Sequence, residues 1–340
     1  MATLPILPAE PNGPGKKLVG IARLAAEGDS IREGHGVEYV TLNVRSILNR
    51  CTAPHMPFAW TINPYRGCEF ACRYCYARYT HEFMELRDPY AFEQQIYVKQ
   101  HTTQLLRQEL KRVKANEDIA IGTATDPYQP AEKRYEVTRA VLEEIARHRG
   151  LSLGIVTKSQ LILRDLDLLR EISQQNSLSV CITVTTTDIQ LARLLEPRAP
   201  RPDIRLDALR MLTAAGITAG VNCAPVLPGI TDSRRMLEPV IRAAAEANAH
   251  FVFVNPLFLK SCSAAVFYPF LEQHFPHLVA SYKKRYEGTG YLPATYRKQL
   301  GALVNALCKK HGLPDREERA RLRELGRKIA DARNQQLALF

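Results

Sequence analysis

A regular alternation of short apolar runs and longer helical patterns begins near residue 57 and limits the possible folds of this chain more than any other feature. Six runs have the composition of strands: Phe58–Asn63, Ile119–Thr125, Leu153–Ser159, Ser179–Thr186, Thr218–Pro225 and Phe251–Pro256. Helical patterns separate them, at about 99–115, 131–148, 161–174, 203–215 and 233–247. Strands that alternate with helices build parallel sheets. We therefore predict an α/β fold, a partial (β/α)6 TIM-like barrel with an N-terminal extension and a C-terminal helical region.

Hydrogen-bonding residues close most of these predicted strands at one end. The first strand runs directly into a loop with three cysteines, and the next four end in residues 122–130, 157–159, 183–188 and 222–225. The carboxyl ends of parallel strands meet at one edge of a barrel, where the active sites of complete barrels lie. A barrel that serves only stability has little reason to repeat this arrangement, so we expect a site at that edge.

Cys68, Cys72 and Cys75 form a C-x3-C-x2-C pattern in the loop after the first predicted strand. Three thiolates so close together are most simply ligands of one inorganic centre. In a four-iron cluster they leave one iron free for nitrogen and oxygen donors of a second molecule. Two alternatives remain open, a zinc site completed by His81 and three unrelated buried thiols. Zinc sites more often use paired C-x2-C sequences, and the chain has no second pair, which favours the cluster.

The cysteine loop, with Tyr74 just before its last cysteine, resembles the cluster motif of radical S-adenosylmethionine (radical SAM) enzymes. Further segments resemble the branch of that superfamily related to spore photoproduct lyase, namely 126–130 (DPYQP), 157–159 (TKS), 196–198 (EPR) and 224–225 (AP). The resemblance implies a 4Fe-4S cluster whose open iron binds the amine and carboxylate of S-adenosyl-L-methionine. It also implies an external one-electron reductant and reductive cleavage of that cofactor to a 5'-deoxyadenosyl radical. The protein would supply placement and shielding for this chemistry.

The resemblance assigns contacts on the adenine and carboxylate sides of the cofactor. It implies that Tyr74 lies beside the adenine, that Tyr76 is the family's aromatic after the third cysteine, and that a backbone group near Ala224 meets the adenine. Lys158 would contact the carboxylate or ribose side of the cofactor. A tyrosine face suits adenine and a cation suits a carboxylate. Tyr74 and Tyr76 could instead be core aromatics, and Lys158 could pair with a nearby acid.

Three further residues complete the cofactor site that the resemblance implies. Thr125 and Asp126 stand at the end of the second strand, where the superfamily usually binds the methionine amine, and Thr185 is a candidate for the ribose. A carboxylate suits an ammonium group, and hydroxyls suit ribose. Alternatively, Asp126 could merely initiate a turn before Pro127.

The sequence departs from spore photoproduct lyase at the hydrogen-donating cysteine that follows the second strand. The corresponding stretch, residues 122–126, contains no cysteine, and Thr123 stands approximately in that place. A threonine hydroxyl holds its hydrogen too strongly to reduce a carbon radical readily, so the lyase's own route is in doubt. The best-placed substitute thiol is Cys223, with Cys181 and Cys262 behind it. Single buried cysteines are mostly inert, so packing is the alternative role for Cys223.

The regions before and after the predicted barrel, which spans 51–260, differ from it in composition. Several prolines and glycines among the first fifteen residues predict a flexible N-terminal extension over 1–50, in which residues 39–45 have the pattern of a strand. Residues 261–333 form a helical, basic C-terminal region with segments near 263–275, 276–287, 294–311 and 315–334. Residues 281–340 carry 14 Lys or Arg against 6 Asp or Glu, which gives +8 of the total net charge of +11. Such a region suits a polyanion such as nucleic acid, although a solvated helical surface is equally consistent with the charge.

Residues 334–340 form a tail that ends in apolar side chains. Its sequence resembles the Q-L-x-L-F peptide by which bacterial DNA polymerases and repair proteins bind the sliding clamp. Leu337, Leu339 and Phe340 would enter apolar pockets while Gln336 fixes the orientation. The alternative is that the tail folds back onto its own domain.

These features together predict a radical SAM enzyme that acts on DNA in repair or lesion processing and is recruited by the sliding clamp. One alternative keeps the radical chemistry but changes the substrate to RNA or a peptide. Another is a non-catalytic, metal-stabilised nucleic-acid-binding protein. No apolar run reaches the roughly 18 residues of a spanning helix, and the N-terminus lacks the apolar core of a signal peptide, so we expect a cytoplasmic protein without a membrane partner.

Overall fold

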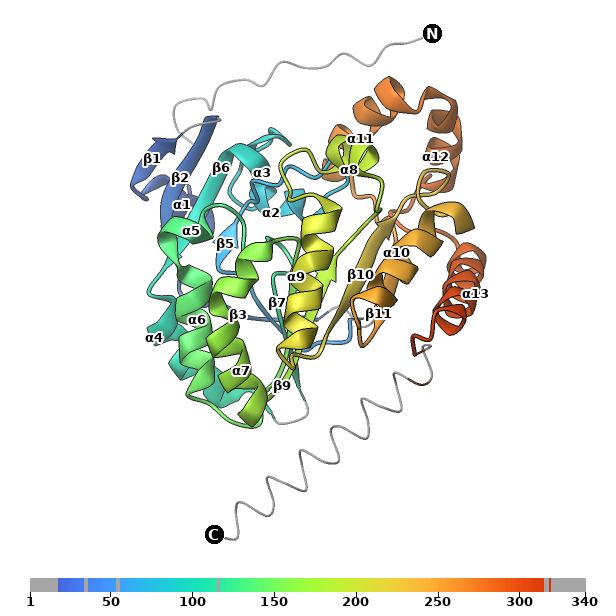
Figure 1. The fold of residues 1–340 in the computed structure, drawn as a ribbon. Coiled ribbons are helices and arrows are strands. Elements are labelled where there is room, and N and C mark those ends of the chain that lie inside the picture. Colours follow the sequence, from blue (N-terminus) through green and yellow to red (C-terminus); the bar gives the residue numbers. More distant parts are fainter. Residues whose placement is uncertain (1–17, 34–35, 53–55, 115–116, 315–317, 319–340) are drawn as a thin grey trace, which may run out of the picture.

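The fold is built on a sheet in which six consecutive strands are all parallel. A computed structural model describes residues 18–33, 36–52, 56–114, 117–314 and 318 (Figure 1). The parallel strands are β4 (Trp60–Ile62), β7 (Asp118–Ile121), β8 (Ser152–Thr157), β9 (Ser177–Thr183), β10 (Ala219–Val226) and β11 (Val252–Pro256). They are ordered β11-β10-β9-β8-β7-β4, and β3 (Leu48–Arg50) adds an antiparallel edge strand next to β4. Each overlaps one predicted strand, which confirms the α/β fold with six parallel βα units.

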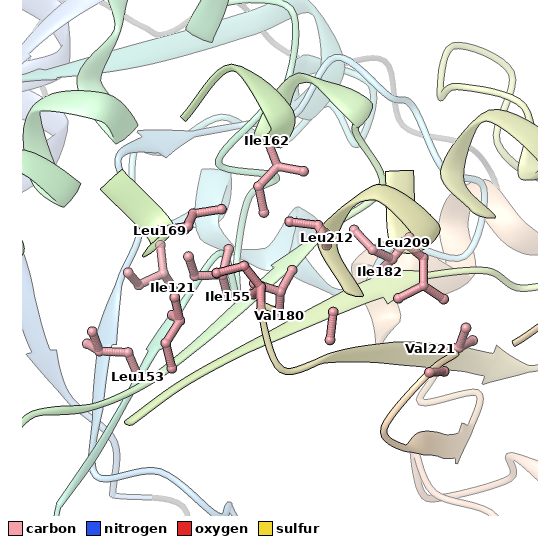
Figure 2. Close-up of a cluster of buried hydrophobic side chains, with 14 of the residues drawn as sticks. Ile121, Leu153, Ile155, Ile162, Leu169, Val180, Ile182, Leu209, Leu212 and Val221 are labelled. Atoms are coloured by element: carbon pink, nitrogen blue, oxygen red, sulfur yellow. The ribbon is translucent and has the colours of Figure 1, made fainter. Parts of the chain in front are cut away.

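The main core lies between the outer face of this sheet and the helices that follow each strand. These helices are α4 (Thr102–Glu109), α6 (Val137–Ala146), α7 (Leu166–Gln175), α9 (Pro202–Ala214) and α10 (Arg234–Glu246). Figure 2 shows alternate strand residues such as Ile155, Val180 and Ile182 packed against Leu169 and Leu212 of the helices. Because successive side chains of a strand point to opposite faces, the residues between these apolar ones point to the inside of the barrel. That inner face is lined largely by small and polar side chains.

A second, four-stranded sheet corrects the prediction that residues 1–50 form a flexible extension. From residue 20 onward this region contains α1 (Gly20–Ala26), β1 (Ser30–Glu33), β2 (Val37–Asn43) and β3. The sheet order is β1-β2-β6-β5, where β6 is Gln95–Gln100 and β5 is Tyr65–Arg66, and β2 is parallel to β6. Val40 and Leu42 of β2 are buried with Tyr97 of β6, so apolar burial holds the segment in place. The strand β6 and the short α3 (Ala91–Gln94) were not predicted.

Up to residue 314, three α-helices follow the barrel, in the places where the first three C-terminal helices were predicted. They are α11 (Ser261–His274), α12 (Val279–Arg285) and α13 (Ala294–Lys310), which packs beside β11 and α10 (Figure 1). The predicted helix at 315–334, except residue 318, and the predicted tail at 334–340 lie outside the described residues. Over the described ranges, no helix combines the length and the apolar composition needed to cross a membrane.

Candidate active site

A cavity of about 2700 Å³ lies against the inner face of the sheet and is bordered by the cysteine loop and by α13. Its strand residues include the small side chains of Ala120, Gly154, Ser179 and Asn222, which leave the inside of the barrel open. Small-molecule pockets usually measure about 300–1,000 Å³, so this cavity has room for a cofactor and a substrate together.

The cysteine loop begins at Gly67, whose backbone no other residue could adopt without strain. Gly67 has φ +82°, and a Cβ there would lie 2.7 Å from the Gln95 carbonyl oxygen and 2.8 Å from that of Phe92. The Gly67 carbonyl oxygen accepts hydrogen bonds from Thr125 Oγ1 at 2.5 Å and Gln129 Nε2 at 3.2 Å. The start of the loop is therefore fixed between β6 and the segment that follows β7.

Glu69 fixes the next part of the loop from two sides. Its carboxylate accepts hydrogen bonds from the Tyr39 hydroxyl of β2 at 2.9 Å and from the Ala131 backbone N–H at 2.8 Å. The Glu69 backbone N–H donates to Gln129 Oε1 at 3.0 Å. Glu69 and Gln129 thus hold the loop. Gln129 lies in the segment 126–130 that carries the family resemblance, but neither residue was assigned a role from the sequence, where a lone acid and a lone amide carry no spacing signal.

The three cysteines of the loop are free thiols that line the same cavity. Burial raises the pKa of all three thiols, and it raises that of Cys72 to about 12. Within the described part of the chain, no three His, Cys, Asp or Glu side chains converge at the distances that a single metal ion requires. A four-iron cluster does not need such convergence, because each thiolate binds a different iron. Three unpaired thiols around one cavity are the donor set that this cluster uses.

His81, the fourth ligand of the zinc alternative, lies outside the cavity. Its ring is buried edge-on against Phe92 and Tyr97, and its Nε2 is 3.0 Å from the Gln95 carbonyl oxygen. Burial lowers the His81 pKa to about 4, so the imidazole is neutral at pH 7. The structure therefore gives His81 a packing role under the second sheet.

Tyr74 is held by a buried polar network at the carboxyl end of β9. Its hydroxyl lies 3.2 Å from Thr185 Oγ1 and donates to Glu196, which also accepts from Thr185 at 2.9 Å. Glu196 forms an ion pair with Arg205, not with the neighbouring Arg198, and both partners are about 1% exposed. Glu196 directly follows α8 (Ile189–Leu195), and Arg205 lies in the first turn of α9, so the pair joins the two ends of the connection between these helices.

Lys158 stands above this network, with its ammonium nitrogen 5.8 Å from the centre of the Tyr74 ring. Burial lowers the Lys158 pKa, but the neighbouring Cys72 and Glu196 outweigh burial and leave it above its usual value. Lys158 therefore places a permanent positive charge on the wall of the cavity, close to the thiols.

Asp126 and Thr125 both make structural hydrogen bonds. The Asp126 carboxylate accepts from the Thr157 hydroxyl at 2.6 Å, the Tyr128 N–H at 2.9 Å and the Lys158 N–H at 2.8 Å. The bond to Tyr128, two residues on, is the turn geometry weighed as the alternative. Thr125 Oγ1 is likewise engaged with Gly67 and Gln129. Both residues line the cavity and both also order the ends of β7 and β8.

The remaining predicted residues separate into two groups. Thr123, Tyr76 and Ala224 line the cavity, and the Tyr76 hydroxyl donates to the Thr123 carbonyl oxygen. Cys223 does not line the cavity. Its side chain is fully buried in the outer core, because it alternates along β10 with Asn222 and Ala224, which face inward. Of the substitute thiols, only Cys181 on β9 belongs to the described cavity wall.

Comparison with known families decides the class of this site. The family model of the radical SAM superfamily matches residues 62–238, more than half of the chain. This chain belongs to the radical SAM superfamily. Its cofactors are accordingly a 4Fe-4S cluster and S-adenosyl-L-methionine.

Relatives of this radical SAM protein span most of its length. An uncharacterized protein of Mycobacterium tuberculosis is 37% identical over 304 residues, which cover 88% of this chain and 87% of that protein. An uncharacterized protein of Methanocaldococcus jannaschii is 28% identical over 274 residues, which cover 81% of this chain and 95% of that protein. Spore photoproduct lyase complexed with dinucleoside spore photoproduct superimposes with a TM-score of 0.60 at 17% identity, covering 80% of this chain and 79% of that one. This similarity shows a shared radical SAM fold.

Proposed function

We propose that this radical SAM enzyme acts on DNA, in repair or lesion processing. The size and charge of the cavity carry the proposal. At about 2700 Å³ it exceeds what S-adenosyl-L-methionine alone would fill. Its wall has five cationic side chains against two carboxylates: Lys114, Arg149, Lys158, Arg297 and Lys298 against Asp118 and Asp126. A positive wall of this kind favours a polyanionic substrate over a neutral one.

In this proposal different residues of the cavity bind the cluster and the different parts of S-adenosyl-L-methionine. Cys68, Cys72 and Cys75 would hold the cluster, and the chemistry that the cluster would supply is one-electron reductive cleavage of S-adenosyl-L-methionine, with the electron provided by an external reductant. Lys158, with its positive charge, attracts the carboxylate of the methionine moiety.

The remaining contacts in this proposal come from the cysteine loop and from residues at or just beyond strand ends. Tyr74, Tyr76 and the backbone at Ala224 border the adenine, and Thr185 is the candidate for the ribose. Thr125 and Asp126 form the wall beside the methionine amine. The Asp126 carboxylate already accepts three hydrogen bonds, two of them from Thr157 and Lys158 at the end of β8. We therefore assign Asp126 two roles: it positions Lys158 and the end of β8, and it contacts the methionine amine.

Deuterium transfer tests the proposed substrate class. The reconstituted enzyme would be incubated under reducing, air-free conditions with S-adenosyl-L-methionine and DNA deuterated on its sugars and bases, both intact and ultraviolet-damaged. We expect deuterium in the 5'-deoxyadenosine product, measured by mass spectrometry, because the radical abstracts hydrogen from a substrate held in the same cavity. Unlabelled DNA is the control. Transfer from deuterated RNA or peptide but not from DNA would contradict the proposal and support the alternative substrates.

We also propose that the segment Gln336–Phe340 binds a bacterial DNA sliding clamp. Its Q-L-x-L-F sequence supports this proposal. Deleting residues 336–340 is expected to weaken binding to purified clamp by at least about 100-fold, since a short peptide depends on its few apolar anchors. Surface plasmon resonance measures this change. Ala338→Ser is the matched control, because the pattern leaves that position free, and unchanged binding by the deletion variant would refute the clamp site.

A further inference from the structure

Two aromatic pairs lie along the β11 side of the cavity. Phe258 and Tyr291 are stacked, with ring centroids 4.4 Å apart and planes inclined by 26°. Phe251, which directly precedes β11, and Phe253 in β11 form the second pair, with centroids 4.8 Å apart. All four rings border the cavity, and β11 is an edge strand of the main sheet.

The outer rings of both pairs remain accessible. Tyr291 is 61% exposed and Phe253 is 42% exposed, whereas aromatic pairs that serve only packing are usually buried. The inner ring, Phe258, lies 6.3 Å from Tyr76, which follows Cys75 directly in the chain. A series of rings therefore leads from the accessible face of Tyr291 to the cysteine loop.

The backbone is adapted to hold Tyr291 in this position. A Cβ on Gly290 would lie 2.8 Å from Phe258 Cε2 and 3.0 Å from the Leu259 carbonyl oxygen. Glycine is thus required for the segment before Tyr291 to approach Phe258 so closely. The Gly290 carbonyl oxygen also accepts a hydrogen bond from the Leu259 N–H at 3.0 Å, which ties the two segments together.

Cationic side chains accompany the exposed rings. Arg297 and Lys298, near the start of α13, are exposed and border the same cavity. The Lys260 ammonium lies 5.8 Å from the centre of the Phe258 ring. Exposed aromatic faces within a positively charged groove are the combination by which proteins bind single-stranded nucleic acids, since the rings stack bases and the cations contact the backbone.

We propose that the accessible faces of Tyr291 and Phe253 stack unpaired bases of single-stranded nucleic acid and so guide a nucleotide into the cavity. This inference rests on the proposed function and specifies the form of its substrate. In a duplex the bases are already stacked on one another, so a duplex would have to open or extrude a nucleotide before it could use these rings.

Oligonucleotide binding tests the proposal on the full-length protein. We expect Tyr291→Ala and Phe253→Ala each to weaken binding of a fluorescein-labelled, mixed-sequence single-stranded DNA by about 10-fold in fluorescence anisotropy. Tyr291→Phe keeps the ring and should bind like the unmodified protein. Tyr90→Ala is the matched control, because Tyr90 is 38% exposed but lies outside the cavity.

Two readouts separate this inference from the proposed function. Circular dichroism and urea unfolding of Tyr291→Ala and Phe253→Ala should match those of the unmodified protein, which shows that a loss of binding is not a loss of folding. Unchanged binding by both alanine variants, or an equal loss in Tyr90→Ala, would overturn the stacking proposal. If stacking is overturned in this way, deuterium transfer from intact duplex DNA would still support a DNA substrate. Binding that depends on the rings, without any deuterium transfer, would support the stacking site and contradict the proposed reaction.

Discussion

Cys72→Ala is expected to lose the iron–sulfur cluster and, with it, cleavage of S-adenosyl-L-methionine. With two thiolates remaining, the cluster would lack a third protein ligand. The rate of 5'-deoxyadenosine formation should fall to the uncatalysed background, a loss of at least about 10⁶-fold. Iron and sulfide analysis after air-free reconstitution and chromatographic detection of 5'-deoxyadenosine measure the two losses.

Cys262→Ala provides the matched control for this experiment. Cys262 is also a free thiol, half-buried where Cys72 is buried, but it lies at the start of α11 and outside the described cavity wall. This variant should keep its iron and its activity. A Cys72→Ala protein that still cleaved the cofactor, or an unmodified protein that bound zinc and no iron–sulfur cluster, would contradict the assignment of the three ligands.

Arg205→Met is expected to lower the free energy of unfolding by about 3–5 kcal/mol. The substitution would leave the Glu196 carboxylate buried without its cationic partner, next to Tyr74 and Thr185. Burial alone would raise the Glu196 pKa, and in the intact protein Arg205 and Lys158 outweigh burial and lower it. Urea unfolding followed by circular dichroism measures the change in stability.

The exposed ion pair between Arg201 and Asp203 supplies the control for Arg205. Both of its side chains are about half exposed, so Arg201→Met should leave the stability nearly unchanged. The double variant Glu196→Gln/Arg205→Met is expected to regain part of the loss, because it removes the buried carboxylate that Arg205→Met leaves without its partner. Equal stabilities of Arg205→Met and Arg201→Met would show that the buried pair does not hold this side of the cavity together.

The parallel strands could be predicted from sequence because each is a short apolar run bounded by turn residues, a local signal. The cluster loop could be predicted for the same reason, since its three thiols lie within eight residues. In contrast, the pairing of β2 with β6 joins segments that are more than fifty residues apart, and neither strand shows which partner it will have. Pro5, Pro8 and Pro11 suggested a flexible extension, although the apolar residues of β2 begin well beyond them.

The sequence does not show whether the Cys223 side chain points into the barrel or toward the outer helices. Along β10, Asn222 and Ala224 share one face and Cys223 the other, as strand alternation requires. The helices cover one face of the sheet, and the sequence of β10 does not say which face that is. The prediction that Cys223 supplies a hydrogen atom to the site therefore had no geometric support. The Glu196–Arg205 pair was not predicted either, because the two residues lie nine positions apart and on different sides of the connection between α8 and α9.

The hydrogen bond between Tyr39 and Glu69 shows that the cysteine loop depends on a strand outside the segment that the family model matches. The segment recognised by the family model begins at residue 62, yet β2 and the Tyr39 hydroxyl, which lie before it, support the loop that carries the cysteines. The segment that the family model matches is therefore shorter than the segment needed to hold the cysteine loop in place. A chain shortened to residues 62–238 would keep Cys68, Cys72 and Cys75 and lose part of the scaffold that orients them.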